Sequence, residues 1–584
     1  MTDTAGPRFL FSLALAVACW TAGHAGEAPE GGRPISDADV TYYAGSVGEG
    51  RTVPVDDPRI GSAAVVTITG QPANTWDVAA AKVVTEPVKR GDALLVHFFL
   101  RGRPIDGRGG GVAEFAFERR AAPFTKSVQY LAESESGDGD GDSPWSEFWI
   151  AFRSKEDYAP GESHLKFQLG YLKQTVAIGG VEVWNYGPDV DPGTLPMTPR
   201  TYPGRSRDAA WRKEAAKRID ELRRTDASFV LKDDGGRPVA DQDVRVRLVK
   251  HAFDFGTAVS MERLTEEGDD GDRYREALAE NFNAATVENA LKWRFWDAGS
   301  FDHDRVRRGL RWLNEQDIAA RGHVLVWPGK RYLPDWIIES LDRPAVLKGA
   351  IDTHIREMAG VTRGLVRDWD VLNEVFDNRD LTDAMGDEAM VGWFRTARES
   401  MPGVELYYND YAGLVGGGFP TGHKEHFAQT LRYLIDHDAP IDGMGIQGHF
   451  GELLTPPERL LSELDRWGSF GLKILITEFD TSVPDPELQA DFLEDFLTVC
   501  FSHPGVDGFM LWGFWETAHW RPESALFAAD WTPTAMGRRW QELRDRWTTD
   551  VTVRTDDRGR VEFRGYRGTY EVTSGGRTER FVLD

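Results

Sequence analysis

The sequence predicts an α/β protein built around a (β/α)8 TIM barrel, with an N-terminal all-β sandwich and a small accessory β module. Between residues 251 and 547, short apolar runs alternate with amphipathic stretches, which is the pattern of a parallel α/β fold. The length of this region suits a barrel of eight strands and eight helices. Before it, short alternating runs are separated by Gly, Pro and Asp, which is typical of a sandwich.

Composition limits the partners of the chain. Its 584 residues are enough for several domains. The formal charge of −26 and the pI of about 5.0 argue against nucleic acid and anionic membranes, because both partners require a basic face. The 20 Trp residues suit stacking on sugars as well as core packing. A neutral or polymeric ligand therefore fits better.

Residues 1–25 have the layout of a signal peptide. Arg8 precedes an apolar run over residues 9–18, and small residues continue to Ala25, near which we expect cleavage. The run is too short for an integral membrane span, so a secreted or periplasmic protein is expected. Cys19 lies in a weak lipobox-like sequence, which leaves a lipid-anchored cell-surface form as an alternative. Without Cys19, only Cys500 remains, and no internal disulfide is expected.

The predicted sandwich covers residues 38–187. Its closing run, FQLGYLKQTVAIGGVEVWNYG, resembles the jelly-roll carbohydrate-binding modules of plant-polysaccharide hydrolases. Four aromatic residues are candidate stacking platforms for sugar rings, although core packing is favoured for each of them. They are Trp76, Tyr130, Trp145 and Trp149.

An acidic loop, SGDGDGDS, interrupts this predicted sandwich. It places Asp138, Asp140 and Asp142 at alternate positions, as a calcium loop does. The later glutamate of an EF-hand is missing. A solvated acidic loop is therefore favoured over a calcium site.

Residues 188–226 are predicted to form a Pro- and Gly-rich linker followed by a charged amphipathic helix. The segments 227–250 and 551–584 both have hairpin-like alternation with Gly-containing turns. Neither segment is large enough to be stable alone. We therefore expect the two to join in one discontinuous β module into which the barrel is inserted.

Two buried strands of the predicted barrel end in carboxylates. The run DWDVLNEV carries Glu374 and the run LKILITEFD carries Glu478. Side chains at the carboxyl ends of barrel strands converge on one face, so the two acids are expected to meet across a substrate. Cleavage of a glycosidic bond requires such a pair. Neither standard glycine-rich phosphate loop is found in the sequence, so nucleotide chemistry is not expected.

Seven motifs in order carry a specific resemblance. They are NFNAATVENALKW, RGHVLVW, WDVLNEV, LYYNDY, IDGMGIQGH, ILITEFD and WGFWETAHW. Together they resemble glycoside hydrolase family 10, the endo-β-1,4-xylanases, over nearly the whole region from residue 253 to 547. The resemblance implies a retaining endo-β-1,4-xylanase that hydrolyses xylan or a related plant polysaccharide by double displacement.

The resemblance also implies residue roles. Glu374 matches the acid/base and Glu478 the nucleophile, with Asn373, Gln447, His449 and Asp480 as supporting residues. His449 and Asp480 are expected two positions beyond the ends of neighbouring strands, joined by a hydrogen bond that fixes the histidine tautomer. No metal or cofactor is expected, because carboxylates carry both steps. The implied substrate-binding residues are Glu288, Asn289, Lys292, His323, Trp327, Asn409, Trp512 and Trp520.

Three positions depart from the family pattern. After Trp327 the family commonly has His and, two residues later, Gln, whereas this chain has Pro328 and Lys330; Glu516 stands where Asp is usual. Pro328 lacks a backbone donor and Lys330 adds a charge. Lys330 therefore suggests a substrate with anionic decoration as a hypothesis.

The chain is expected to be a monomer. Two other functions are compatible with the sequence. The first is a β-1,4-glucanase or mixed-specificity hydrolase on the same barrel. The second, from another class, is a non-catalytic cell-surface glycan-binding protein. Intact Glu374 and Glu478 argue against the second.

Overall fold

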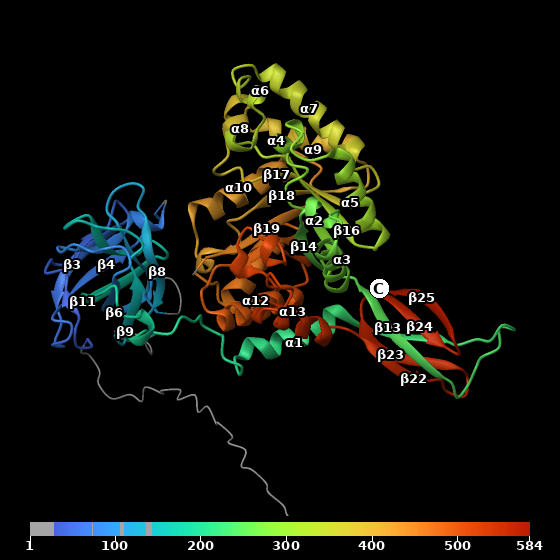
Figure 1. Cartoon of the computed structure of the whole chain (residues 1–584), viewed down its shortest axis with the longest axis horizontal. Helices are drawn as coiled ribbons and strands as arrows, with labels where there is room; N and C mark the ends of the chain where they lie inside the picture. Colours follow the sequence, from blue (N-terminus) through green and yellow to red (C-terminus); the bar gives the residue numbers. More distant parts are fainter. Residues whose placement is uncertain (1–27, 73, 106–109, 136–142, 452) are drawn as a thin grey trace, which may run out of the picture.

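The computed structural model describes residues 28–72, 74–105, 110–135, 143–451 and 453–584. Figure 1 shows a β-sandwich, a barrel and a small β module that follow one another along the long axis. The expected signal peptide with Cys19, and the acidic loop with Asp138, Asp140 and Asp142, lie outside the described residues. In the described ranges, no helix is both long and apolar enough to cross a bilayer.

Two antiparallel sheets form the N-terminal sandwich, with the strand orders β3-β4-β11-β6-β9 and β2-β5-β10-β7-β8; β1 pairs with β11. Apolar residues alternate inward from both sheets, as Phe98 on β6 and Phe115 on β7 do, and fill the core between them. The strands are β1 (Arg33–Pro34), β2 (Thr41–Tyr43), β3 (Gly48–Pro54), β4 (Ser62–Ile68), β5 (Ala79–Val83), β6 (Ala93–Pro104), β7 (Val112–Arg119), β8 (Lys126–Glu133), β9 (Ser146–Arg153), β10 (Ser163–Gln168) and β11 (Gln174–Gly187).

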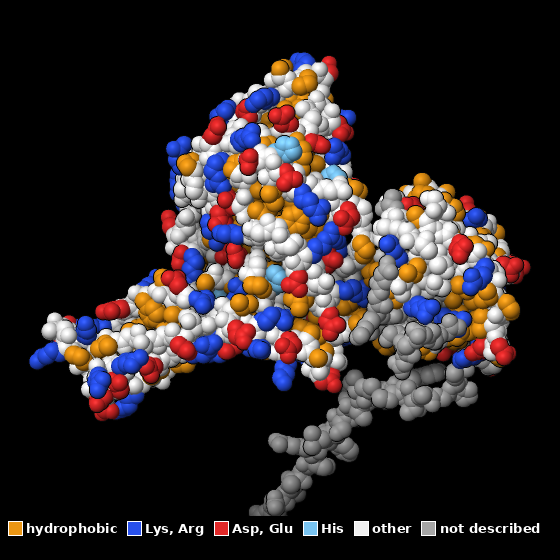
Figure 2. All heavy atoms as spheres, turned by 180° about the vertical axis from the view of Figure 1, so that it is seen from behind, with side chains coloured by type: hydrophobic (Ala, Val, Ile, Leu, Met, Phe, Trp, Pro, Cys, Tyr) orange, Lys and Arg blue, Asp and Glu red, His pale blue; other side chains and the backbone are white. Residues whose placement is uncertain are grey.

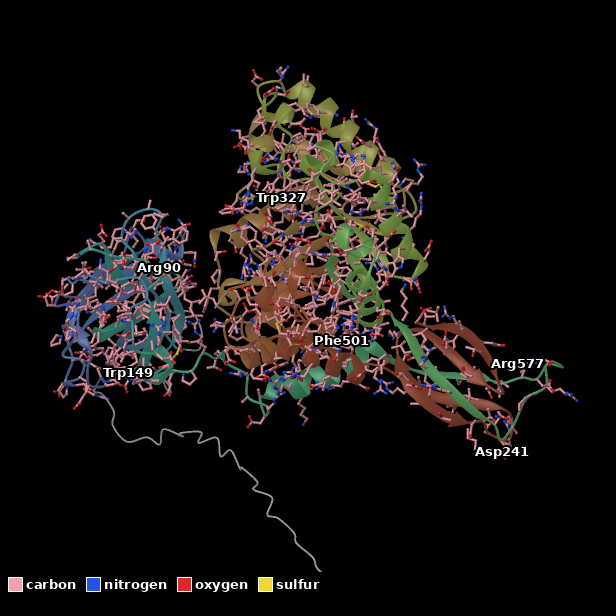
Figure 3. The ribbon with its side chains drawn as sticks, in the orientation of Figure 1. Arg90, Trp149, Asp241, Trp327, Phe501 and Arg577 are labelled. Atoms are coloured by element: carbon pink, nitrogen blue, oxygen red, sulfur yellow. The ribbon has the colours of Figure 1, made fainter. Side chains whose placement is uncertain are left out.

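The four aromatic candidates in the sandwich differ in exposure. Tyr130 belongs to the core. Trp145 and Trp149 are half-buried, and the Trp149 ring, labelled in Figure 3, stacks on His97 with 4.0 Å between ring centres. Trp76 is 55% exposed. The expectation of core packing is therefore wrong for Trp76, which lies in a surface turn where no neighbouring strand covers it.

Eight parallel strands close into a barrel. All six residues of β17 are buried. Trp369, Val371 and Leu372 belong to the hydrophobic core, whereas Asp368 and Asp370 pair with the buried Arg321. The strands are β14 (Asp254–Val259), β15 (Ala284–Val287), β16 (Ala319–Val326), β17 (Asp368–Asn373), β18 (Glu405–Asp410), β19 (Gly443–Phe450), β20 (Lys473–Thr481) and β21 (Val506–Leu511).

The strands β19 and β20 extend further than the sequence pattern predicts. His449 and Asp480 lie within them and face each other in register. The expectation that both residues lie beyond the strand ends is therefore wrong. Polar residues are tolerated here because the two side chains hydrogen-bond to each other inside the barrel mouth.

Helices surround the barrel, and several of them are capped by the side chain of the preceding residue. Asp485, for example, accepts hydrogen bonds from the first turn of α12, where Pro486 takes the first helical position. The longer helices are α3 (Asp269–Asn281), α5 (His303–Glu315), α7 (Pro344–Val361), α9 (Glu388–Ser400), α10 (Gly422–Asp436), α11 (Pro457–Gly468), α12 (Pro486–Ser502) and α13 (Ala535–Arg546). The shorter ones are α2 (Met261–Leu264), α4 (Trp293–Asp297), α6 (Asp335–Ile338) and α8 (Asp380–Met385).

The segments before and after the barrel pair with each other in the β module. β13 lies between β22 and β24, and β12 pairs with β23. Val244, Val246, Val561 and Tyr570 form its small core. The strands are β12 (Arg224–Val230), β13 (Asp243–His251), β22 (Asp550–Arg554), β23 (Arg560–Tyr566), β24 (Gly568–Ser574) and β25 (Arg577–Leu583).

The predicted linker and helix are anchored to the barrel. Helix α1 (Ala210–Arg223) runs beneath α12 in Figure 1. Tyr202, which precedes it, is buried and donates a hydrogen bond to Asp495 on α12 at 2.9 Å. Arg212 on α1 pairs with the same carboxylate. This segment is therefore a packed connection rather than a free spacer.

The sandwich contacts the barrel at the loop that follows β18. The rings of Tyr171 and Phe419 lie 5.1 Å apart, edge to face. Arg459 lies over Phe419 at 4.3 Å and pairs with Glu133 of the sandwich at 2.6 Å. An apolar contact and an ion pair thus join the two parts beside a loop whose first residue, Tyr411, lines a cleft of the barrel.

Candidate active site

A cleft of about 900 Å³ lies where the barrel strands end. The residues that line it follow, or close, the strands β15 to β21, so their side chains come from separate parts of the chain. Trp327, labelled in Figure 3, is one of them. The full lining is Glu288, Asn289, Lys292, Trp293, Arg294, Phe295, His323, Val324, Trp327, Arg331, Tyr332, Glu374, Tyr411, Gln447, His449, Glu478, Trp512, Trp520 and Arg521.

Glu374 begins the turn after the buried strand β17. Its backbone has φ of 50°, a conformation that a residue with a side chain adopts only when the surroundings impose it. Two contacts hold it there: its N–H donates to the carbonyl of Asn409 at 3.0 Å, and its own carbonyl accepts from Asn378 at 3.0 Å. The turn directs this carboxyl to the cleft.

Glu478 lies on β20 and is 4% exposed. Asn409 donates to its Oε1 at 2.8 Å, and His449 Nε2 lies 2.9 Å from its Oε2. Both carboxylate oxygens therefore have a hydrogen-bond partner that holds the side chain in place.

Amide side chains connect the two acids. Gln447 Nε2 donates to Glu374 Oε1 at 2.9 Å and lies 3.4 Å from Asn373 Oδ1. Asn409 donates to the same Asn373 oxygen at 3.0 Å as well as to Glu478. The buried Nδ2 of Asn373 has no hydrogen-bond partner among the described residues. This donor is therefore left unsatisfied by the described residues, and a buried donor without a partner is costly unless a ligand meets it.

Asp480 accepts three hydrogen bonds. The expected bond to His449 Nδ1 is present at 2.8 Å, and Trp520 Nε1 and Arg521 Nη1 donate at 2.7 and 2.8 Å. Burial alone would lower the pKa of His449, but the carboxylates of Asp480 and Glu478 outweigh it and raise the pKa to about 9. The imidazole is therefore a cation at neutral pH, with an N–H for each acid.

The environment of Glu374 favours the neutral, protonated form of its carboxyl. Burial raises its pKa to about 7, and the negative charges of Glu478 and Asp410 act in the same direction, against the hydrogen bond from Gln447. Near neutral pH, Glu374 thus holds a proton that it can donate, while Glu478 is surrounded by donors. The environment of Glu374 thus suits a carboxyl that donates a proton.

One end of the cleft is formed by the residues after β15 and β16. Lys292 donates to Asn289 at 2.8 Å and lies over the Trp327 ring at 5.3 Å, and burial lowers its pKa. Burial also raises the pKa of Glu288. His323 Nδ1 bonds Asp370 at 2.9 Å, which fixes the ring. These groups supply donors and acceptors for hydroxyls.

Two indoles border the catalytic centre. Trp512 is nearly buried and meets the rings of His323 and His449 edge-on, at 5.3 and 6.2 Å between centres. Trp520 is 52% exposed while its N–H is fixed on Asp480. A fixed, exposed indole face suits the apolar face of a sugar ring. All fourteen residues singled out from the sequence thus lie in or against this cleft.

Lys330, one of the residues that differ from the family pattern, forms its contacts outside the cleft. Its Nζ pairs with Asp380 at 3.1 Å, its N–H donates to the same carboxylate at 2.8 Å, and it does not line the cleft. The expectation that Lys330 adds a charge beside the substrate is therefore wrong. Asp380, fifty positions further along the chain, binds the ammonium outside the cleft.

Several cleft residues were missed from the sequence. Tyr332 stacks on Trp327 with 3.4 Å between ring centres and an angle of 10°. Tyr332 lies five residues after Trp327, in the segment that departs from the family pattern. A second aromatic residue so close to Trp327 is the one sequence signal that could have pointed to it. The others are Trp293, Arg294, Phe295, Val324, Arg331, Tyr411 and Arg521.

The barrel, the two buried carboxylates and the surrounding indoles define the class of glycoside hydrolases. A sequence model described as Glycosyl hydrolase family 10 matches residues 246–538, half of the chain. The chain belongs to this family.

Known relatives share part of the chain. The anti-sigma-I factor RsgI6 of Acetivibrio thermocellus is 31% identical over 62% of this chain and 46% of its own length. Endo-1,4-beta-xylanase 1 of Arabidopsis thaliana is 29% identical over 62% of this chain and 37% of its own. The chain thus spans less than half of either relative. Endo-1,4-beta-xylanase B of Thermotoga neapolitana is 25% identical over 48% of this chain and 84% of its own length.

One similar solved structure is xylanase 10B from Thermotoga petrophila RKU-1 in complex with xylobiose. It is 23% identical, covers 50% of this chain and 94% of its own, and has a TM-score of 0.46. The fold assignment rests on the closed eight-stranded barrel and the family match.

Proposed function

We propose that the protein is a retaining endo-β-1,4-xylanase that hydrolyses the backbone of xylan or a related plant polysaccharide. One observation carries the proposal: Glu374, with its pKa raised to about 7, shares a cleft with Glu478, whose two oxygens accept from Asn409 and His449. Similarity to proteins named endo-1,4-beta-xylanases supports xylan as the substrate.

In the first step, Glu478 attacks the anomeric carbon while Glu374 protonates the leaving oxygen. The glycosidic C–O bond breaks as the bond from carbon to the Glu478 oxygen forms. His449 and Asn409 orient the attacking carboxylate through their hydrogen bonds to it. The partnerless Asn373 N–H is available for a substrate hydroxyl beside the reacting carbon.

In the second step, water attacks the same carbon and the bond to Glu478 breaks. Glu374, deprotonated by the first step, accepts the proton of the water. Esterification has removed the charge of Glu478, so the pKa of Glu374 falls at the stage where it acts as a base. Two inversions at carbon give retention of configuration.

Product analysis on matched polysaccharides tests the proposal. The full chain is incubated with xylan and with soluble β-1,4-glucan, and reducing ends and oligosaccharides are measured. Xylo-oligosaccharides as the main product support the proposal, and faster release from glucan favours the glucanase alternative. No product from either substrate, with binding retained, favours a non-catalytic glycan-binding protein.

We also propose that the N-terminal sandwich binds polysaccharide. The exposed Trp76 supports this, because an exposed indole is a platform for a sugar face. The test uses the full chain with Glu478→Gln, which prevents turnover, and compares its retention on insoluble xylan with and without Trp76→Ala. Equal retention contradicts the proposal.

We further propose export, on the pattern of residues 1–25. The N-terminal sequence of the mature protein tests it. A mature chain that begins near residue 26 supports a signal peptide, one that begins at a modified Cys19 supports a lipid anchor, and one that begins at Met1 contradicts both.

A further inference from the structure

Two arginines line one end of the cleft, away from the catalytic pair. Arg294 lies on α4 after β15, and Arg331 lies in the short turn after β16, next to Tyr332. Both side chains are exposed. They come from the two loops that also carry Lys292 and Trp327, so this end of the cleft is basic in a chain of net charge −26.

Arg294 is fixed in place without being neutralised. Its Nη1 donates to the backbone carbonyl of Arg331 at 2.8 Å, which joins the two loops. Its Nη2 lies 3.9 Å from Asp335, a carboxylate that is 86% exposed and therefore a weak partner. Most of the guanidinium charge thus remains available at the cleft surface.

Arg331 has still fewer partners. Its guanidinium lies 5.4 Å from the centre of the Tyr332 ring. Within the described ranges of the chain, no ion pair includes Arg331, and its neighbour Arg294 has only the exposed Asp335. Figure 2 shows basic and acidic side chains interspersed over the surface seen from behind.

The position of the pair indicates its ligand. Tyr332 stacks on Trp327, and Lys292 lies over the other part of that indole, so Arg331 stands next to the residues proposed to bind backbone sugars. A neutral pentose chain offers hydroxyls, which the nearby Glu288, Asn289 and Lys292 suit. Guanidinium groups instead match the geometry and charge of a carboxylate.

We propose that Arg294 and Arg331 bind the carboxylate of an acidic side group, such as a uronic acid, carried by the polysaccharide backbone. The inference rests on the proposed function and adds a preference for acid-decorated chains. It moves the anion-binding role from Lys330 to its neighbour in sequence, because the Lys330 ammonium is held by Asp380 outside the cleft.

The experiment compares kcat/KM of the full chain on two xylo-oligosaccharides of equal length, one with and one without a uronic acid side group. Wild type is expected to prefer the acidic substrate. Arg294→Ala and Arg331→Ala are each expected to lower the ratio of acidic to neutral kcat/KM by roughly three- to tenfold, mainly through KM, as for loss of a hydrogen-bonded ion pair at a partly exposed site. Arg331→Lys, which keeps the charge but loses the planar fork, is expected to give an intermediate ratio.

Lys330→Ala is the matched control, because it removes the same charge one position away. Its ratio is expected to equal that of wild type. The inference is overturned if the ratio of acidic to neutral kcat/KM is unchanged in both arginine variants. It is also overturned if Lys330→Ala lowers this ratio as much as the arginine variants do, because the effect then comes from the overall positive charge of the loop. If wild type hydrolyses neither oligosaccharide, the proposed function itself is wrong and the inference falls with it.

Discussion

The Nε2 atom of His449 lies 2.9 Å from Oε2 of Glu478. The other ring nitrogen is held by Asp480 at 2.8 Å, and the two carboxylates raise the pKa of His449 to about 9. A cationic imidazole therefore contacts Glu478, the proposed nucleophile, while Glu374 lies in a site that favours its neutral form. The two glutamates of this cleft therefore have different surroundings: hydrogen-bond partners meet both oxygens of Glu478, whereas burial raises the pKa of Glu374.

The activity is expected to fall at alkaline pH. Glu374 must hold a proton to act as an acid, and its pKa is about 7. The kcat/KM of wild type should therefore decrease by roughly tenfold per pH unit above that value. His449 stays protonated over most of this range. Initial rates between pH 5 and about 9 test this, and a flat profile across neutrality would assign the acid to another residue.

Glu374→Ala is expected to discriminate between leaving groups. Removal of the acid should slow xylan hydrolysis by roughly 10²- to 10⁴-fold, because a sugar oxygen leaves poorly without a proton. An aryl xylobioside with a dinitrophenolate leaving group needs no proton and should lose far less in its first step. Added azide should then yield a glycosyl azide of retained configuration. Equal losses on both substrates would contradict the acid role.

The same residue should link stability to pH. The pKa of Glu374 is raised in the folded chain, so its proton is bound more tightly there than in the unfolded chain. The stabilisation is complete below the ordinary glutamate pKa and is lost as pH rises through about 7. At pH 8, Glu374→Gln should stabilise the protein on the order of 2 kcal/mol, a value reduced for the partial exposure of the group.

Urea unfolding of wild type and Glu374→Gln at acidic and alkaline pH measures this effect. The gain at alkaline pH should disappear at pH 4, where both side chains are neutral. A gain of equal size at both pH values would point to packing rather than to charge.

Asn373→Ala should affect turnover more than binding. The Nδ2 of Asn373 has no partner in the described part of the chain, and its Oδ1 accepts from Asn409. A donor aimed at a substrate hydroxyl that strengthens its bond in the transition state contributes to kcat. We expect kcat to fall by roughly 10- to 100-fold with KM nearly constant. A selective rise in KM would assign the amide to ground-state binding.

His449→Phe tests the support of the nucleophile. The variant keeps a ring of similar shape but removes the donors to Glu478 and Asp480. The first step should slow strongly even for a dinitrophenyl leaving group, which distinguishes this variant from Glu374→Ala. An aryl substrate hydrolysed at the wild-type rate would show that the hydrogen bond to Glu478 has no catalytic role.

Much of the barrel could be predicted because its signal is local. Each strand is a short buried run, and Glu374 and Glu478 follow from the rule that such strands end at one mouth. The full length of β19 and β20 could not be predicted from the sequence. His449 and Asp480 have the polarity of loop residues, and the strands tolerate them only as a hydrogen-bonded pair. Burial of a polar pair depends on the partner strand, which the local pattern does not contain.

Loop residues escaped prediction for a similar reason. Lys330 and Arg331 are adjacent cations, yet Asp380 binds only the first, so the second is left at the cleft. The contact between Tyr171 and Phe419, which joins the sandwich to the barrel, links residues far apart in sequence. Such pairings depend on the folded arrangement rather than on any motif.

Covalent trapping tests the central assignment most directly. A 2-deoxy-2-fluoro xylobioside with a good leaving group should form the glycosyl-enzyme but release it slowly, since fluorine destabilises the second transition state. Mass spectrometry of the digested protein should then find one added fluoroxylobiosyl group on the peptide that contains Glu478, and Glu478→Gln should remain unlabelled. A label on any other residue, or turnover that gives the inverted product without a label, would contradict the proposed double displacement.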